Sequence, residues 1–271
     1  MCIKYLLPYS SKNLLIDSHI HVGQFEDNYF SPSCVSRYMA DIGVDFYAVS
    51  STSMCEEDYE KVLHEMEELI HIDGEKVLPV MWITPYGLKG NIAWFLESSI
   101  QWRCLKIHPY LHPNEWQNDG SLMEEVVEIA TELNVPILIH TGNEASCVSS
   151  KFKSIISSHS NVNFILAHGR PTDEAVKLIK QYNNAYVDSA FMSIKEIGTF
   201  IKEGTADKML WGTDMLIPKH FYPQMDMIKY YQMKLDTFKQ MCSKEQFEKV
   251  TYKNAMSLFN LNENSYFETL N

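Results

Sequence analysis

Long apolar runs are absent from this 271-residue sequence, which contains no stretch of about eighteen consecutive apolar residues. The N-terminal octapeptide Met1–Pro8 is too short and too interrupted for a signal peptide. The six cysteines lie far apart without a C-x-x-C pair, which argues against a disulfide framework and a structural zinc knuckle. We therefore expect a cytoplasmic protein with reduced thiols and no membrane partner.

Positive charge is also scarce. Lysine and arginine total 23 against 35 acidic residues, the net charge is −12, and there are only three arginines, Arg37, Arg103 and Arg170. Nucleic-acid and anionic-membrane surfaces draw on clustered Lys and Arg, so neither is expected as the main partner, although a small basic pocket is still allowed. A hydrophobic content of 45% is ordinary for a globular protein and provides for a sizeable core.

Short apolar segments recur at intervals of roughly 25 to 40 residues, each followed by a turn and an amphipathic segment, which is typical of βα units around a parallel sheet. No linker interrupts the series, so the chain is predicted to be one domain, residues 1–271. Eight units favour a (β/α)₈ TIM barrel with extra C-terminal helices, and an open doubly wound sheet is the alternative. The predicted strands are Leu14–His19, Val44–Ser50, Val77–Ile83, Cys104–His108, Pro136–His140, Asn163–His168, Ala185–Ser189 and Met209–Asp214.

Helix signals fall between these strands. Ser31 and Pro32 form a capped helix start, and Gly43 ends that helix. Apolar residues at helical spacing predict the other helices, and the last two of them close the barrel. They span Glu56–Ile70, Ser121–Leu133, Thr172–Tyr182, Ser193–Glu203, Gln224–Phe238 and Lys244–Phe259.

The first predicted strand, Leu14–His19, leads into the motif Asp17-Ser18-His19-Ile20-His21. Side chains alternate along a strand, so His19 and His21 lie on the same side and both imidazoles can reach one ion. Imidazole nitrogens are common ligands of zinc and of neighbouring transition metals. An isolated H-x-H pair is more often structural, so this pair indicates a metal only if other ligands join it.

Histidines, a lysine and an aspartate stand at the ends of other predicted strands. In a barrel these strand ends meet at one rim, where active sites lie. These residues are Lys106 and His108 on strand four, His140 on strand five, His168 on strand six and Asp214 on strand eight. Each of the last three directly follows an apolar run, where a buried polar group needs partners. This convergence predicts a metal site.

The ordered motifs resemble the amidohydrolase superfamily, and within it the branch that includes aminocarboxymuconate semialdehyde decarboxylase-like proteins. They are Asp-x-His-x-His, Lys-x-His-Pro from Lys106, the strand-end His140, Ala-His-Gly around His168, Gly-x-Asp ending at Asp214, Asn254-Ala255 and Leu258-Phe259. The resemblance implies that His19, His21, His140 and Asp214 hold one divalent ion, with zinc expected. Asp214 would also be the general base, and His168 would orient the water and stabilise oxyanion charge.

The role of strand four is left open. Lys106 is expected to bind a substrate carboxylate, to pair with Asp214, or to be carboxylated and bridge a second ion, as in some family members. His108 shares its face. With a second ion, His140 and His168 would ligate it. Arg170 follows His168-Gly169, and its planar guanidinium suits a carboxylate or a phosphate. We therefore predict Lys106, His108 and Arg170 as substrate-binding residues, and Asp17 as a support for a ligand imidazole.

The leading hypothesis is a metal-dependent hydrolase, in which a metal-activated water attacks a carbonyl, ester, amide or lactone centre of a small substrate, which is allowed to be anionic. The alternative is a non-oxidative decarboxylase of a small unsaturated or aromatic acid, for which Arg170 or a lysine would hold the carboxylate. A third hypothesis is a metal-binding barrel without turnover, against which the intact ligand set argues. No nucleic-acid partner is expected, and a homo-oligomer is allowed.

Overall fold

Within residues 14–90, 92–116 and 120–261, which the computed structural model describes, nine strands form one curled sheet in the order β2-β1-β3-β4-β5-β6-β7-β8-β9. The octapeptide Met1–Pro8 and its Cys2 lie outside the described residues. All neighbouring strands pair in parallel except β2, which forms an antiparallel hairpin with β1. The strands are β1 Ile16–Phe25, β2 Asn28–Phe30, β3 Phe46–Ser51, β4 Val77–Trp82, β5 Cys104–Ile107, β6 Ile137–His140, β7 Phe164–Ala167, β8 Ala185–Asp188 and β9 Met209–Leu210.

The sheet closes because the segment after β9 returns to β1. The backbone N–H of Ser18 donates to Trp211 O at 2.8 Å, and that of Asp214 donates to His19 O at 2.8 Å. Gly212 permits this approach, since a Cβ at that position would lie 3.3 Å from His19 Cβ. The closed ring confirms the predicted (β/α)₈ barrel over the open sheet.

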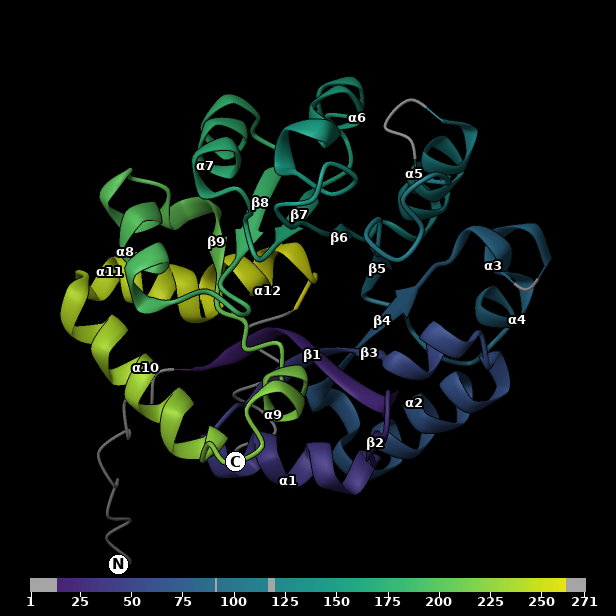
Figure 1. Ribbon diagram of the computed structural model, residues 1–271, viewed down its shortest axis with the longest axis horizontal. Coiled ribbons are helices and arrows are strands. Elements are labelled where there is room, and N and C mark those ends of the chain that lie inside the picture. The colour runs from purple at the N-terminus through teal and green to yellow at the C-terminus, as the bar shows by residue number, and fades with distance from the viewer. Residues whose placement is uncertain (1–13, 91, 117–119, 262–271) are drawn as a thin grey trace, which may run out of the picture.

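Helices surround the barrel as a ring (Figure 1). The predicted caps are present at two of them: Ser31 accepts from the backbone N–H of Cys34, and Ser193 forms a capping box with Glu196. The helices are α1 Pro32–Ile42, α2 Tyr59–Asp73, α3 Pro85–Gly90, α4 Ile92–Leu96, α5 Ser121–Leu133, α6 Lys153–Ser158, α7 Thr172–Gln181, α8 Ile194–Lys202, α9 Ile217–Phe221, α10 Met227–Met241, α11 Lys244–Glu248 and α12 Asn254–Leu258.

Some predicted boundaries are wrong. The first strand does not end at His19 but continues to Phe25, because its outer part pairs with β2. The helix predicted from Glu56 begins at Tyr59, where the side chain of Asp58 caps it, and a 3₁₀ turn precedes it. The last predicted helix is divided into α11 and α12 by a π-helical turn at Lys249–Lys253.

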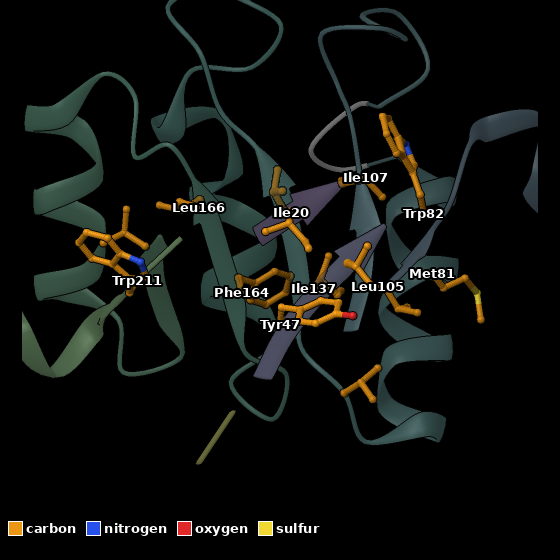
Figure 2. Packing of buried hydrophobic residues seen from close by; sticks show 14 of the residues in the cluster. Ile20, Tyr47, Met81, Trp82, Leu105, Ile107, Ile137, Phe164, Leu166 and Trp211 are labelled. Carbon is orange, nitrogen blue, oxygen red and sulfur yellow. The ribbon is translucent and has the colours of Figure 1, made fainter. Parts of the chain in front are cut away.

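The core has two clusters, one inside the barrel and one between the barrel and its helices. Figure 2 shows part of the outer cluster, where Leu105, Ile137 and Phe164 lie on three neighbouring strands. The inner cluster joins residues of the strands, such as Ile16, to Ala255, Met256, Leu258 and Phe259 at the end of the chain. Helix α12 therefore closes one end of the barrel, and the polar site lies at the other end.

Among the described residues, no helix has the length and apolar character that crossing a membrane requires.

Candidate metal centre

Polar side chains gather at the carboxyl ends of the barrel strands. His19 and His21 lie on β1, Lys106 on β5 and His140 at the last position of β6. His168 and Asp214 follow β7 and β9, and each adopts a left-handed conformation, with φ of 66° and 61°. This conformation is uncommon for residues other than glycine and is typical of functional sites, because it redirects a side chain at the end of a strand.

Three of the four predicted ligands converge. His21 Nε2 lies 3.1 Å and His19 Nε2 lies 3.5 Å from Asp214 Oδ1. All three side chains are buried, and their ligand atoms lie within 4.8 Å of one another. His140 lies outside this group, because its Nδ1 pairs with His168 Nε2 at 3.2 Å. The Nε2 atom of His140 is not part of that hydrogen bond.

Hydrogen bonds at the far side of each ring orient the two histidines. His19 Nδ1 donates to Asp188 Oδ2 at 2.8 Å. His21 Nδ1 lies 3.1 Å from Ser50 Oγ and 3.3 Å from the carbonyl oxygen of Ser50. With the proton on Nδ1, each Nε2 presents a lone pair to the centre of the barrel mouth, the space enclosed by the carboxyl ends of the strands.

Burial lowers the pKa of His19 well below its usual value, and that of His21 to about 4, so both rings are neutral at pH 7. Burial also acts to raise the pKa of Asp214, but its contacts with His21, His19 and His168 hold it below its usual range. The mouth thus presents two imidazole lone pairs beside an ionised carboxylate.

Lys106 is the cation nearest to these acceptors. Its Nζ lies 3.0 Å from His19 Nε2 and 3.1 Å from His21 Nε2, and it stands 4.6 Å from the centre of the Trp82 ring. Burial lowers the pKa of this lysine to about 8, while the charge of Asp214 acts to raise it. Because each Nε2 has one lone pair, it either accepts from Lys106 or binds a metal. Metal binding therefore requires Lys106 to leave this contact.

Two of the predicted residues, His108 and His140, form a stack of rings with Trp82. His108 lies between Trp82 and His140, with ring centres 5.4 and 3.8 Å apart. His108 Nδ1 is buried without a hydrogen-bond partner in the described part of the chain. His168 Nδ1 donates to Ala190 O at 3.0 Å, which leaves its Nε2 to accept from His140. The segment Lys106–His108, at the end of β5, thus contributes both a cation and an aromatic ring.

Asp188 is a site residue that the sequence reasoning missed. It is fully buried at the end of β8, and its Oδ1 accepts the backbone N–H groups of His168 and Ala190 at 2.9 and 3.0 Å. With its Oδ2 on His19, it fixes two of the predicted site residues. The signal was an aspartate at the end of an apolar strand, as for Asp214.

Asp17 supports the barrel rather than a ligand ring. Its Oδ1 accepts the backbone N–H groups of His19 at 3.2 Å and Thr213 at 3.1 Å, and its Oδ2 accepts from Thr213 Oγ1 at 2.6 Å. It therefore ties β1 to the segment after β9, and Asp188 makes the imidazole contact expected of it. Burial raises the pKa of Asp17 to about 7, although these hydrogen bonds oppose the shift.

Arg170 lies beside the mouth rather than within the cluster. Its guanidinium donates to Phe191 O at 3.0 Å and stands 5.8 Å from the centre of that ring. It lines a cavity that none of the predicted metal ligands lines.

The donor set fits a divalent ion. His21 Nε2 and Asp214 Oδ1 lie 3.1 Å apart, and both are acceptors when the neutral His21 carries its proton on Nδ1. Such a pair needs a cation beside it, and neutral imidazoles with a carboxylate are ligands suited to zinc and related metals. A second group, formed by His19, His168 and Asp188, also brings its ligand atoms within 4.8 Å of one another. In that group, Asp188 is already engaged by three donors.

Fold and site define an α/β barrel with a candidate metal centre at the carboxyl ends of its strands. The model of the amidohydrolase family matches residues 16–261, and the chain belongs to this family of metal-dependent enzymes. The family predicted from the motifs is therefore confirmed. The comparison with curated proteins finds no match.

Solved structures share the fold at low sequence identity. A zinc-bound amidohydrolase from Burkholderia multivorans is 9% identical, with 92% of this chain and 100% of that chain covered and a TM-score of 0.67. 5-Carboxyvanillate decarboxylase from Sphingomonas paucimobilis is 12% identical, with 92% of this chain and 100% of that chain covered and a TM-score of 0.63. A probable 2-pyrone-4,6-dicarboxylic acid hydrolase from Acinetobacter baumannii with citric acid bound is 11% identical, with 91% of this chain and 99% of that chain covered and a TM-score of 0.59.

Proposed function

We propose that this chain is a metal-dependent hydrolase that uses an activated water against a carbonyl, ester, amide or lactone centre of a small, anionic substrate. The observation that carries the proposal is the convergence of His19 Nε2, His21 Nε2 and Asp214 Oδ1, with both Nδ1 atoms already engaged. His140, through its Nε2, completes the proposed ligand set. A divalent ion there, zinc by its donors, would supply Lewis-acid chemistry and lower the pKa of a water molecule.

The residues of the mouth divide the remaining work. Asp214 is ionised at neutral pH and accepts the proton of the attacking water on its carboxylate. His168, fixed through Nδ1 by Ala190 O, orients the water and stabilises the developing oxyanion charge, a role that requires its Nε2 to leave the contact with His140 and to carry a proton. Lys106, His108 and Arg170 are the proposed substrate-binding residues.

Non-oxidative decarboxylation is a second candidate, favoured by the buried ammonium of Lys106 at the mouth. A substrate carboxylate that accepts a hydrogen bond from Lys106 would lie beside the proposed metal ligands. The reaction would release it as CO₂, and a proton handled by His168 or Asp214 would take its place on the substrate carbon. One of the similar solved structures is named a probable hydrolase and another a decarboxylase, so the fold permits both reactions.

Elemental analysis of the purified protein, followed by assays of lactone, amide, phosphoester and carboxylic-acid panels with metal restored, tests the proposal. We expect one ion per chain, hydrolysis that stops on metal removal, and no CO₂ release. CO₂ release that needs the metal would replace the hydrolase with the decarboxylase. Turnover that survives complete metal removal would overturn both.

A further inference from the structure

A second polar site lies between helices α8 and α10, beside the barrel mouth. It is a cavity of about 450 Å³, within the size range of small-molecule pockets. None of the residues that line it is a proposed metal ligand. Its walls include Phe191, Met192, Tyr222 and Tyr230, and two cationic side chains, Arg170 and Lys234, also line it.

Lys234 is the unusual member of this wall. It lies on α10 with 4% of its surface exposed, and its hydrogen bond within the described part of the chain is a long one, 3.4 Å from Nζ to Ser189 O. The Nζ atom stands 5.6 Å from the ring centres of both Trp211 and Tyr231. In the part of the chain that the structure describes, no carboxylate forms a salt bridge with Lys234. A buried ammonium without an ionic partner is costly, so a ligand that pairs with it would bind favourably.

The charge of the cavity is positive on balance. Arg170 likewise forms no salt bridge among the described residues, and its guanidinium contacts only the backbone and ring of Phe191. Glu196 is the acidic residue in the wall, and its Oε2 already accepts the backbone N–H and hydroxyl of Ser193. Burial lowers the pKa of Lys234 to about 8, and nearby acids act to raise it, so the lysine is mostly charged at pH 7.

We propose that this cavity binds a small aromatic monocarboxylate, with the carboxylate between Lys234 and Arg170 and the ring against Phe191, Tyr222 and Tyr230. Planar guanidinium and ammonium groups suit a carboxylate, and the aromatic and methionine side chains suit an apolar ring. The lining of this site contains no proposed metal ligand, and Arg170 is the one residue that it shares with the proposed substrate-binding residues.

Calorimetric titration of the full-length protein with benzoate and with its neutral counterpart benzamide tests the site. Removal of one charge-assisted contact is expected to weaken binding by about 10-fold or more. We therefore expect benzamide to bind at least about 10-fold more weakly than benzoate, and Lys234→Met to weaken benzoate by a similar factor. Lys229→Met is the matched control, since Lys229 is exposed on the same helix and is not among the cavity residues.

Arg170→Gln provides a second variant that leaves α10 unchanged, and circular dichroism checks that each variant folds. We expect Arg170→Gln to weaken benzoate as well. Absence of saturable benzoate binding, equal affinity for benzamide, or an affinity unaffected by Lys234→Met would each overturn the proposal. Benzoate affinity that is lost in Lys106→Met and kept in Lys234→Met would place the ligand at the mouth instead and would also overturn it.

Discussion

Lys106 at the barrel mouth and Lys234 in the α8–α10 cavity are the same residue type in two opposite settings. Both are almost fully buried, at 1% and 4% exposure, and burial lowers the pKa of both to about 8. Lys106 faces two imidazole lone pairs and lies near Asp214. Lys234 faces aromatic rings and one distant carbonyl oxygen.

The difference shows what each region can attract. At the mouth, acceptors outnumber the single ammonium, so a metal cation can replace Lys106 there. In the cavity, two cations face rings, so an anion is the missing partner. Burial of a lysine is therefore not by itself a sign of function, and the neighbouring groups decide which ligand a site favours.

Removal of the mouth acceptors should have the largest effect. His19→Ala combined with His21→Ala is expected to abolish metal retention and to lower turnover by about 1,000-fold or more, because two of the proposed ligands are lost. Benzoate binding in the cavity should persist, which separates the two regions. The measurements are metal content by elemental analysis, turnover and calorimetry.

His159→Ala is the control for the double variant. His159 pairs with the partly exposed Glu124 far from the mouth, so its removal should leave both metal and turnover unchanged. Full activity in the metal-free double variant would contradict the proposed mechanism. Loss of benzoate binding in the same double variant would show that the barrel mouth and the α8–α10 cavity are not independent.

The support for His19 should have the next largest effect. Asp188→Asn weakens the acceptor that orients His19 Nδ1 and also two backbone N–H contacts. Loss of such a support typically costs about 10- to 100-fold in metal affinity, which a competitive chelator titration measures. Asp236→Asn, at an exposed position of α10, should have no effect. An unchanged affinity in Asp188→Asn would assign that carboxylate a purely structural role.

The sequence was sufficient for the barrel because each βα unit has its own local signal. Ser31, Gly43 and Ser193 form the predicted caps, and the apolar segments became the eight parallel strands. Boundaries failed where distant contacts decide them. β1 extends to Phe25 because it pairs with β2, and no local pattern announces that hairpin.

For the site, strand-end position and residue type were enough to bring His19, His21 and Asp214 together. They could not show that His140 pairs with His168, since the distance between two strand ends depends on the curvature of the barrel. The cavity was beyond reach for a similar reason. Lys234 lies in a helix that was predicted only to close the barrel, and the packing of α10 on the barrel brings its side chain into the wall of the same cavity as Arg170.

Charge removal at the mouth should have a smaller effect, in the opposite direction. In Lys106→Met, the ammonium no longer competes for His19 Nε2 and His21 Nε2, so zinc affinity should rise by about 10-fold, as expected for the loss of one repelling charge nearby. Substrate affinity should fall, because a proposed anion contact is lost. Lys234→Met is the matched control and should leave zinc affinity unchanged. Weaker zinc binding in Lys106→Met would mean that the lysine supports the metal.

The smallest expected effect is on stability, and it distinguishes the cavity from the mouth without any ligand. Lys234→Met removes a buried charge that has no ionic partner among the described residues, and it keeps an apolar chain of similar length. The free energy of unfolding at pH 7 should therefore rise by about 1 kcal/mol. The pKa of Lys234 is about 8 in the folded protein, against 10.5 for a solvent-exposed lysine, so the unfolded state binds more protons between these values. The free energy of unfolding of the wild type therefore rises with pH from about 8 to 10.5, and the stability advantage of the variant should shrink over the same window.

Urea unfolding at pH 7 and pH 10 measures both effects, with Lys229→Met as the control. A variant that is less stable than wild type at pH 7 would show that the contacts of Lys234 with Ser189 and the two rings outweigh the cost of its burial.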